Sequence, residues 1–399
     1  LLGTSKLVPD LMVRAPEVLQ MFAHADELAS RDPVEVAHSL RAAVLRHTDV
    51  GEAVRTARSL RRHELLRVAS ADLLDLLAAP AVCAALTSVW VSVLDAALAV
   101  VLRAKAAAEG PAPGRLAVIG MGRLGGAELG YGSDADVLFV CEPNPGVSDS
   151  DAVRWASSVA EALRTELSSP SQDPPLEVDA NLRPEGRQGP LVRTLDSYRA
   201  YYAKWSEPWE AQALLRARPV TGDADLGARF IAAIDPIRYP SGGLDQAKVR
   251  EIRRIKARVD GERLPRGADP STHTKLGRGG LADVEWTVQL LQLRHAHEVP
   301  GLRTTSTLSG IAAAAAAGLL SAADADALRV AWLAATRARN ATMLVRGKAS
   351  DQLPTQAREL AAVASAATGH TVTEPGEFLD DYRRTTRRAR AVIERVFYE

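Results

Sequence analysis

The sequence is poor in cysteine and has no net charge, and each shortage excludes a class of protein. Its 399 residues include two cysteines, Cys83 and Cys141, both in apolar surroundings. This excludes a disulfide framework or a cysteine-based zinc site and indicates buried, reduced thiols. Lys plus Arg and Asp plus Glu each number 49, so the overall charge favours neither nucleic acid nor a membrane as a partner. No repeat of fixed period is visible.

Long hydrophobic runs are also scarce. The uncharged run over 76–94 has the length of a membrane span, but Pro80 and three hydroxyl residues dilute it and Asp95 follows it. We therefore expect two packed helices of a soluble protein there. No signal peptide is recognisable, and the reduced thiols lead us to expect a cytoplasmic protein. The chain starts at Leu1 directly in a helical pattern, which indicates a piece of a longer polypeptide.

Proline, glycine and alanine patterns predict an α+β protein that is mostly α-helical. We expect a helical region over 1–109, a small mixed-sheet core over 110–225 and a C-terminal helical bundle over 226–399. The first region is expected to break at Pro9, Pro16, Arg31-Asp32-Pro33 and Pro80, with Ser70-Ala71-Asp72 as a helix start. Three or four Ala-rich helices are expected after Thr305, with a break at "GHTVTEPGEF".

The stretch "RLAVIGMGRLGGAELGYGSDADVLFVCE" (115–142) has two interpretations. The G-x-G-x-x-G spacing of a dinucleotide-binding turn is met at Gly120, Gly122 and Gly125. That fold needs a helix of several turns after the third glycine. Gly130 and Gly132 interrupt the chain soon afterwards, so only a short helix over about 124–129 fits. The geometry therefore favours the other interpretation, a strand headed by acids.

Asp134 and Asp136 come directly before the apolar run "VLFV". Side chains two residues apart on a strand point to the same face, so these carboxylates are expected to converge. Converging carboxylates repel unless a cation lies between them, and Mg²⁺ typically takes one or two carboxylates together with substrate phosphates. The Gly-rich turn upstream would let backbone N–H groups approach such phosphates. An Asp- and Gly-rich turn without chemistry is the plainer alternative.

Nucleotidyl transfer at a two-metal site needs a third acid from a neighbouring strand. The segment "LEVDANLRP" (176–184) is predicted as a strand that would carry Asp179 on its inward face. Glu177 would share that face and is the rival candidate. Arg183 would follow on the same side of a regular strand, where its guanidinium could grip a triphosphate.

The segment "WEAQALLRARPV" (209–220) is predicted as an amphipathic helix. Gln212 and Arg216 are four residues apart and would share one face of it. A helix that only packs Trp209 and Leu214, with its arginines in solvent, is an equally good interpretation.

The loop "KLGRGG" (275–280) precedes a predicted helix over 281–297 and is a second candidate for anion binding. Asp283 and Glu285 would lie in the first turn of that helix. Acids in a first turn commonly do no more than interact with the helix dipole, so capping and function weigh equally here.

Four segments of the chain resemble, in this order, the glutamine synthetase adenylyltransferases, enzymes of bacterial nitrogen control in the nucleotidyltransferase superfamily. They are "GMGRLGGAELGYGSDADVLFV", "EVDANLRPEGRQGPLV", "WEAQALLRARPVTGD" and "GRGGLADVEWTVQLLQLRHAH". The resemblance spans nearly the whole chain. The family carries two related halves, one that adds AMP to glutamine synthetase from ATP and one that removes it by phosphorolysis.

Details of the motifs divide between the two halves. "ELGYGSD", "EVDANLRP" and "ALLRAR" look like the adding half, whereas "GMG" and "KLGRGG" look more like the removing half. Gly132 stands where serine is usual in the family, which leaves Ser133 as the hydroxyl beside Asp134.

The resemblance implies that Asp134, Asp136 and Asp179 are catalytic acids that bind Mg²⁺ in a two-metal site. It implies that ATP phosphates are held by the Gly-rich turn, with Gly122, Gly125 and Gly126, and by Ser133. Arg183, Arg216 and Lys275 are our candidates for accommodating a triphosphate. A tyrosine hydroxyl of glutamine synthetase would attack the α-phosphorus and release pyrophosphate.

The resemblance also implies regulation by glutamine and a PII-type protein, with the helical regions orienting the protein substrate. Two alternatives stay open: removal of AMP by this chain, and a silent module that only binds glutamine synthetase or a PII protein. The intact acid trio favours an enzyme over a silent module.

Overall fold

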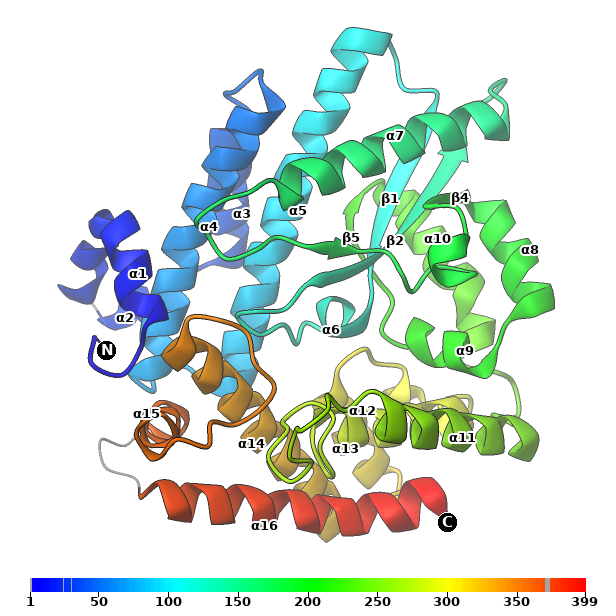
Figure 1. The fold of residues 1–399 in the computed structure, drawn as a ribbon. Coiled ribbons are helices and arrows are strands. Elements are labelled where there is room, and N and C mark those ends of the chain that lie inside the picture. The colour runs from blue at the N-terminus through cyan, green and yellow to red at the C-terminus, as the bar shows by residue number, and fades with distance from the viewer. Residues whose placement is uncertain (1, 24, 30, 370–373) are drawn as a thin grey trace.

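The computed structural model describes residues 2–23, 25–29, 31–369 and 374–399. It confirms an α+β fold that is mostly helical, with one small mixed sheet. Figure 1 shows the sheet between an N-terminal group of helices and a C-terminal group that lies below it. The predicted break at "GHTVTEPGEF" lies partly outside the described residues.

The N-terminal region is helical, as predicted. Its elements are α1 (Leu7–Arg14), the 3-10 helix η1 (Pro16–Ala23), α2 (Ala25–Ala29), α3 (Pro33–Val44), α4 (Val50–Leu73) and α5 (Ala79–Glu109). Two predicted boundaries are wrong. Pro9 does not break α1, because it lies in the first turn, where a backbone N–H has no helical partner to lose. Ser70, Ala71 and Asp72 lie in the last turn of α4 instead of starting a helix.

Helix α5 is one continuous helix of 31 residues, not the two helices expected from the apolar run. Pro80 lies at its N-terminus, where proline is tolerated, and so does not interrupt it. Among the described residues this is the one helix long and apolar enough to cross a membrane, by length and composition alone. Of its most apolar window, 67% is buried inside the protein.

The sheet has the strand order β3-β2-β1-β5, and β4 also pairs with β2. Its strands are β1 (Gly114–Gly120), β2 (Ala135–Pro143), β3 (Val178–Asp179), β4 (Val192–Thr194) and β5 (Arg218–Gly222). β1 pairs antiparallel with β2 and β5, whereas β3 and β4 are parallel to β2. β3 is much shorter than the predicted strand over 176–184.

Strand β5 was missed, because its residues formed the end of the helix predicted over 209–220. The helix there, α9 (Pro208–Leu214), stops early and the chain turns into the sheet. Pro219 removes a backbone donor and favours extended structure, and it lies on an edge strand, where the missing N–H is tolerated.

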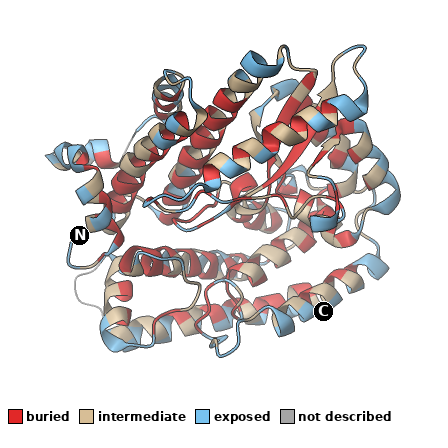
Figure 2. Ribbon diagram, turned by 45° about the horizontal axis from the view of Figure 1, so that its top comes forward, coloured by how far each residue is buried: buried red, intermediate tan, exposed pale blue. Residues whose placement is uncertain are grey.

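Side chains of β2 alternate between the two faces of the sheet. Val137, Phe139 and Cys141 join a cluster with α3, α5 and α7 (Asp149–Ser168), while Leu138 and Val140 join one with α8 (Leu195–Trp205) and α10 (Ala224–Arg238). Both faces are therefore covered, and the central strands β1 and β2 are mostly buried (Figure 2). Because α3 and α5 share a core with the sheet, the division at residue 109 stays a prediction. Cys83 and Cys141 are buried free thiols.

The C-terminal helices pack around a cluster that includes Trp332. They are α11 (Gln246–Glu262), α12 (Leu281–His295), α13 (Thr307–Ala316), α14 (Ala322–Arg346), α15 (Ala357–Thr368) and α16 (Pro375–Ile393), with a final π-helical turn over Glu394–Tyr398. Within the described residues four of these helices follow Thr305, which matches the predicted three or four.

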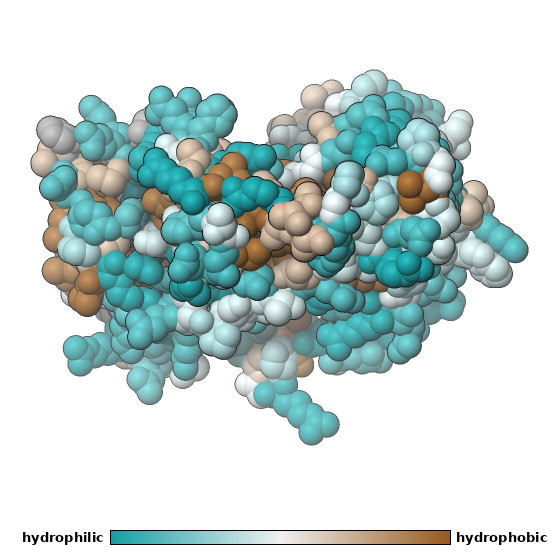
Figure 3. All heavy atoms as spheres, turned by 90° about the horizontal axis from the view of Figure 1, so that it is seen from above, coloured by the Kyte–Doolittle hydropathy of each residue, from teal (hydrophilic) through white to brown (hydrophobic). Residues whose placement is uncertain are grey.

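The face seen in Figure 3 is largely hydrophilic, with apolar residues gathered in smaller patches. Leu2, Val13 and Leu19 are exposed apolar side chains of the N-terminal segment, whose helices α1 and α2 lie on the left in Figure 1.

Candidate active site

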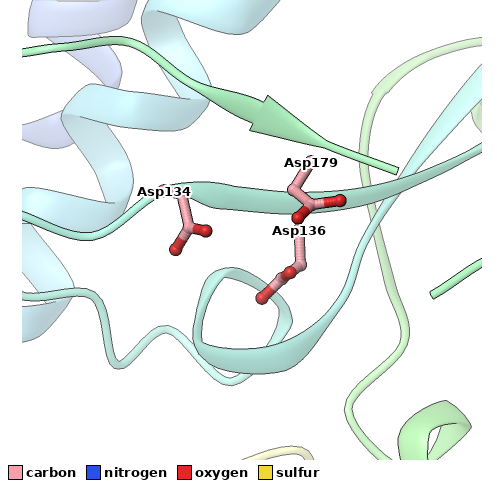
Figure 4. Close-up of side chains that lie close together, drawn as sticks. All are labelled: Asp134, Asp136 and Asp179. Atoms are coloured by element: carbon pink, nitrogen blue, oxygen red, sulfur yellow. The ribbon is translucent and has the colours of Figure 1, made fainter. Parts of the chain in front are cut away.

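The three predicted acids meet at the start of β2 and in β3. One oxygen of each of Asp134, Asp136 and Asp179 lies within 4.8 Å of the other two. Asp136 and Asp179 are partners in the parallel register of β2 and β3, and Asp134 precedes β2. Figure 4 shows the three carboxylates pointing into one space beside the α6 turn. The convergence expected from the i, i+2 spacing is present.

Asp179 is the acid that joins this group, and Glu177 stays outside it. Glu177 is exposed, and its carbonyl oxygen accepts a hydrogen bond from the N–H of Ala135 at 2.9 Å. The Asp179 carboxylate accepts from the backbone N–H of Asn181 at 2.6 Å and from its side-chain amide at 2.9 Å. These two bonds fix the orientation of the Asp179 carboxylate.

Ionising all three acids without a bound cation is unfavourable, because their negative charges repel one another. Burial first, and then the negative charges of Asp134 and Asp179, raise the pKa of Asp136 to about 7, although Lys275 and Arg216 act in the opposite direction. Three carboxylates within a few ångströms form the hard oxygen donor set that Mg²⁺ prefers, so the residues present fit a divalent cation.

The Gly-rich turn lies directly against these acids. It forms α6 (Gly122–Gly125), a single turn that begins earlier than the short helix expected over 124–129. Gly122 has a φ of +50°, and a Cβ atom there would overlap Oδ2 of Asp136. A glycine is therefore required for Asp136 to occupy its position.

The other members of the predicted phosphate cradle are engaged within the protein. The N–H groups of Gly125 and Gly126 donate to the carbonyls of Met121 and Gly122 inside the turn. Ser133 is buried, and its Oγ accepts from the N–H of Gly130 at 2.9 Å. In this structure Gly125, Gly126 and Ser133 shape the turn.

Arg183 does not continue a regular strand toward the acids, as the sequence predicted. Because β3 ends at Asp179, the chain turns and Arg183 donates to three backbone carbonyls of the loop that follows, those of Ala180, Arg187 and Gly189. Its guanidinium holds this loop together.

Arg216 lies in the turn after α9, not on a helical face shared with Gln212. It is buried and hydrogen-bonded to Glu128 and to Thr307 at the start of α13, with Glu285 of α12 at 3.7 Å. Glu128 in turn accepts from the N–H of Thr307 at 2.6 Å. This network joins the sheet region to the C-terminal helices.

Replacing Arg216 by Met is expected to lower the free energy of unfolding by about 3–5 kcal/mol, because it leaves Glu128 buried without its counter-charge. Adding Glu128→Gln to Arg216→Met should recover part of that loss, since the two residues are in contact. Urea unfolding of the wild type, of Arg216→Met and of the double variant measures both effects. An Arg216→Met variant with unchanged stability but weakened ATP binding would instead assign Arg216 to the nucleotide.

Lys275 is the basic candidate that remains available to a ligand. It is exposed, forms no ion pair within the described part of the chain, and lies within electrostatic reach of Asp136. Its loop precedes Gly280, the N-cap residue of α12. The Asp283 carboxylate is buried and accepts hydrogen bonds from Lys256, Arg390 and the N–H of Gly279. Its role is therefore to join these segments of the C-terminal region.

The sequence interpretation missed Arg123, which follows Gly122 in the turn. Its Nε and Nη2 atoms are buried and have no hydrogen-bond partner in the part of the chain that the structure describes. Burial lowers the pKa of Arg123, and the positive charge of Arg339 lowers it further, while Glu285 acts in the opposite direction. Buried N–H groups without partners are unfavourable, which makes the guanidinium of Arg123 a further candidate for binding an anion. The sequence did offer a signal for this residue, because an arginine within a Gly-rich turn is well placed to contact a phosphate.

Residues 1–233 match the family model described as glutamate-ammonia ligase adenylyltransferase, which is more than half of the chain. The chain belongs to this family. Residues 249–397 match a second model, described as GlnD PII-uridylyltransferase. The family resemblance inferred from the four motifs is confirmed.

Curated relatives in the adenylyltransferase family cover nearly the whole chain. The chain is 64% identical to a protein of Mycobacterium avium over 403 residues, 63% to one of Nocardia farcinica over 400 and 61% to one of Mycobacterium tuberculosis H37Rv over 399. Each is named bifunctional glutamine synthetase adenylyltransferase/adenylyl-removing enzyme, and each alignment covers 99% of this chain. The chain spans 40% of the length of these relatives.

Proposed function

We propose that this chain is the adenylyl-adding part of a glutamine synthetase adenylyltransferase. It would transfer AMP from ATP to a tyrosine hydroxyl of glutamine synthetase and release pyrophosphate. The observation that carries the proposal is the convergence of Asp134, Asp136 and Asp179 beside the Gly122 turn. Three acids held together at a cost in repulsion favour an enzyme over a silent binding module.

Each part of the proposed site has a role in this reaction. Mg²⁺ bound by the three acids would polarise the α-phosphate and help to deprotonate the attacking hydroxyl. Lys275, with Arg123 as a further candidate, would bind the outer phosphates, whose charge grows as pyrophosphate leaves. Arg183 and Arg216 would act indirectly, through the loop and the network that they stabilise.

A protein acceptor would reach these acids through two clefts. Asp134 and Glu177 line a cleft between α1, the loop over 172–175 and the end of α14. The same two residues line a second cleft along α7 that also contains Asp179. A hydroxyl entering from these clefts would reach the metal-binding carboxylates without crossing the Gly-rich turn.

Regulation by a PII-type protein and by glutamine, and a cytoplasmic location, belong to the same proposal. The match of residues 249–397 to a PII-uridylyltransferase model supports a regulatory connection for the C-terminal helices. Removal of AMP is the alternative activity, favoured by the "GMG" and "KLGRGG" motifs.

One assay separates adding from removing, because the two reactions use different substrates. With Mg²⁺ and α-labelled ATP, the chain is expected to label unmodified glutamine synthetase. With adenylylated glutamine synthetase and inorganic phosphate, it is expected to release no ADP. An Asp136→Asn chain serves as the inactive control. Phosphate-dependent ADP release without labelling from ATP would assign the removing activity instead.

A further inference from the structure

The segments that carry Asp134 and Asp179 are both held from the N-terminal helices. Trp90 of α5 is buried, and its indole N–H donates to the carbonyl oxygen of Ser133 at 3.3 Å. Ser133 directly precedes Asp134. Hydrogen bonds between Gly130 and Ser133 close the turn that precedes Asp134. Trp90 therefore fixes the end of this turn, directly before β2 begins.

The segment before Asp179 is anchored by Arg61 of α4. The Arg61 guanidinium donates to the carbonyl of Pro174 at 2.6 Å and to that of Pro175 at 3.4 Å. Two successive prolines supply no N–H groups, so this loop cannot pair with a strand through its own donors. Its carbonyls still need partners, and a buried arginine from another part of the chain provides them.

The strand itself is too short to fix Asp179. β3 has two residues, and its ladder with β2 consists of the pairs Ala135↔Val178 and Asp136↔Asp179. Strands in globular proteins usually have about 3–10 residues, and isolated pairs of them are only marginally stable. The position of Asp179 relative to Asp134 therefore depends on the contacts that hold the loop upstream.

Arg61 and Trp90 also contact each other. The Arg61 guanidinium carbon lies 6.0 Å from the centre of the Trp90 ring system, within the range of a cation–π contact. One pair of side chains thus holds the carbonyl before Asp134 and the carbonyls that lead to Asp179. Both side chains are almost completely buried.

Stability alone does not account for a buried arginine at this place. Burial lowers the pKa of Arg61 to about 10 although the charge of Asp173 acts in the opposite direction, and none of its hydrogen-bond partners in the described residues is a carboxylate. A well-packed apolar side chain in place of a buried charge is often neutral or stabilising. The geometry of the carbonyls it holds is the property that an apolar side chain could not supply.

We propose that Arg61 and Trp90 are positioning residues that set the separation of Asp134 and Asp179, so that the N-terminal helices are part of the metal site. This inference rests on the proposed function only in that the three acids bind a divalent cation. It predicts that small changes far from the carboxylates weaken metal binding, as loss of supporting contacts typically does by about 10–100-fold.

The test compares matched substitutions by the binding of Mn²⁺, measured by electron paramagnetic resonance, and by steady-state kinetics. Trp90→Phe removes one N–H and keeps a ring. Trp332→Phe is its control, because Trp332 is equally buried and its N–H has no hydrogen-bond partner among the described residues. Arg61→Lys keeps the positive charge but loses the planar guanidinium whose two nitrogens bond the two carbonyls. Arg67→Lys is its control, a buried arginine of the same helix bonded to Glu64 and Leu28.

Trp90→Phe and Arg61→Lys are expected to raise the Kd for Mn²⁺ about 10-fold and to lower kcat with little change in the KM for ATP. Both controls should bind Mn²⁺ as the wild type does, even if their melting temperatures fall. The double variant should lose less than the sum of the single losses, since both residues set one distance.

Equal Mn²⁺ affinity in Trp90→Phe and Trp332→Phe, or in Arg61→Lys and Arg67→Lys, would overturn the positioning role. The kinetic assay answers a separate question. A wild-type chain that binds Mn²⁺ but transfers no AMP would contradict the proposed function and leave the metal-affinity comparison as the test of Arg61 and Trp90.

Discussion

Replacing Asp136 by Asn is expected to abolish AMP transfer and leave the metal-free protein at least as stable as the wild type. An oxygen of Asp136 lies within 4.8 Å of one from each of the other two acids, and Asp136 is paired with Asp179 across β2 and β3. Its loss removes a ligand from the site and a negative charge from a repulsive cluster. Asp134→Asn should behave in the same way. Labelling of glutamine synthetase and urea unfolding measure the two effects.

The stability effect has a defined dependence on pH. The pKa of Asp136 is raised from its ordinary value of 3.8 to about 7 in the folded protein, so the folded protein binds more protons than the unfolded chain between these pH values. Ionising Asp136 therefore lowers the free energy of unfolding as the pH rises from about 4 to about 7. The Asn variant lacks this loss, so its advantage should be largest above pH 7 and vanish near pH 4.

Once Mg²⁺ and ATP are added, the wild type is expected to be more stable than Asp136→Asn, because bound ligand stabilises the folded state. A ligand at 100 times its Kd stabilises the wild type by about 2.7 kcal/mol, and a variant that binds weakly gains much less. Asp72→Asn is the matched control, because Asp72 is another carboxyl whose pKa burial raises, to about 6, and it lies outside the trio. Near-normal turnover in Asp136→Asn would rule out the assignment of these acids to the metal.

The acid site was predictable because it depends on local geometry. The i, i+2 spacing of Asp134 and Asp136 at the head of an apolar strand dictates that both side chains share a face, and the structure has them together. Gly122 was singled out for the approach of backbone N–H groups to phosphates, whereas the structure shows that a glycine there is needed for the close approach of Asp136. The α+β class followed from helical periodicity around a few short apolar runs.

The basic residues were not predictable, because their positions depend on where the chain turns. Arg183 points into its own loop since β3 ends after two residues, and Arg216 is buried since α9 gives way to β5. Helical propensity over 209–220 concealed that change. Arg61 and Trp90 have no local pattern at all. Their partners, Pro174 and Ser133, are far away in the sequence and meet them only in the folded protein.

The second large effect is expected when the third acid of the site, Asp179, is replaced. Asp179→Asn is expected to lower kcat by several orders of magnitude, because Asp179 completes the oxygen cluster with Asp134 and Asp136. Glu177→Gln is expected to change kcat little. Glu177 is two residues away on the same segment and is exposed, so it is a matched control for any local disturbance of β3.

The two variants separate the loss of a charge from the loss of a fold. The Asp179 carboxylate accepts two hydrogen bonds from Asn181, and an asparagine side chain can still accept from the backbone N–H of that residue. Asp179→Asn should therefore keep its melting temperature without Mg²⁺ and lose the stabilisation that Mg²⁺ and ATP give the wild type. Steady-state labelling and thermal unfolding with and without Mg²⁺ measure these outcomes. A large kcat loss in Glu177→Gln with a normal Asp179→Asn would mean that Glu177, from the neighbouring register position, supplies the third ligand during turnover.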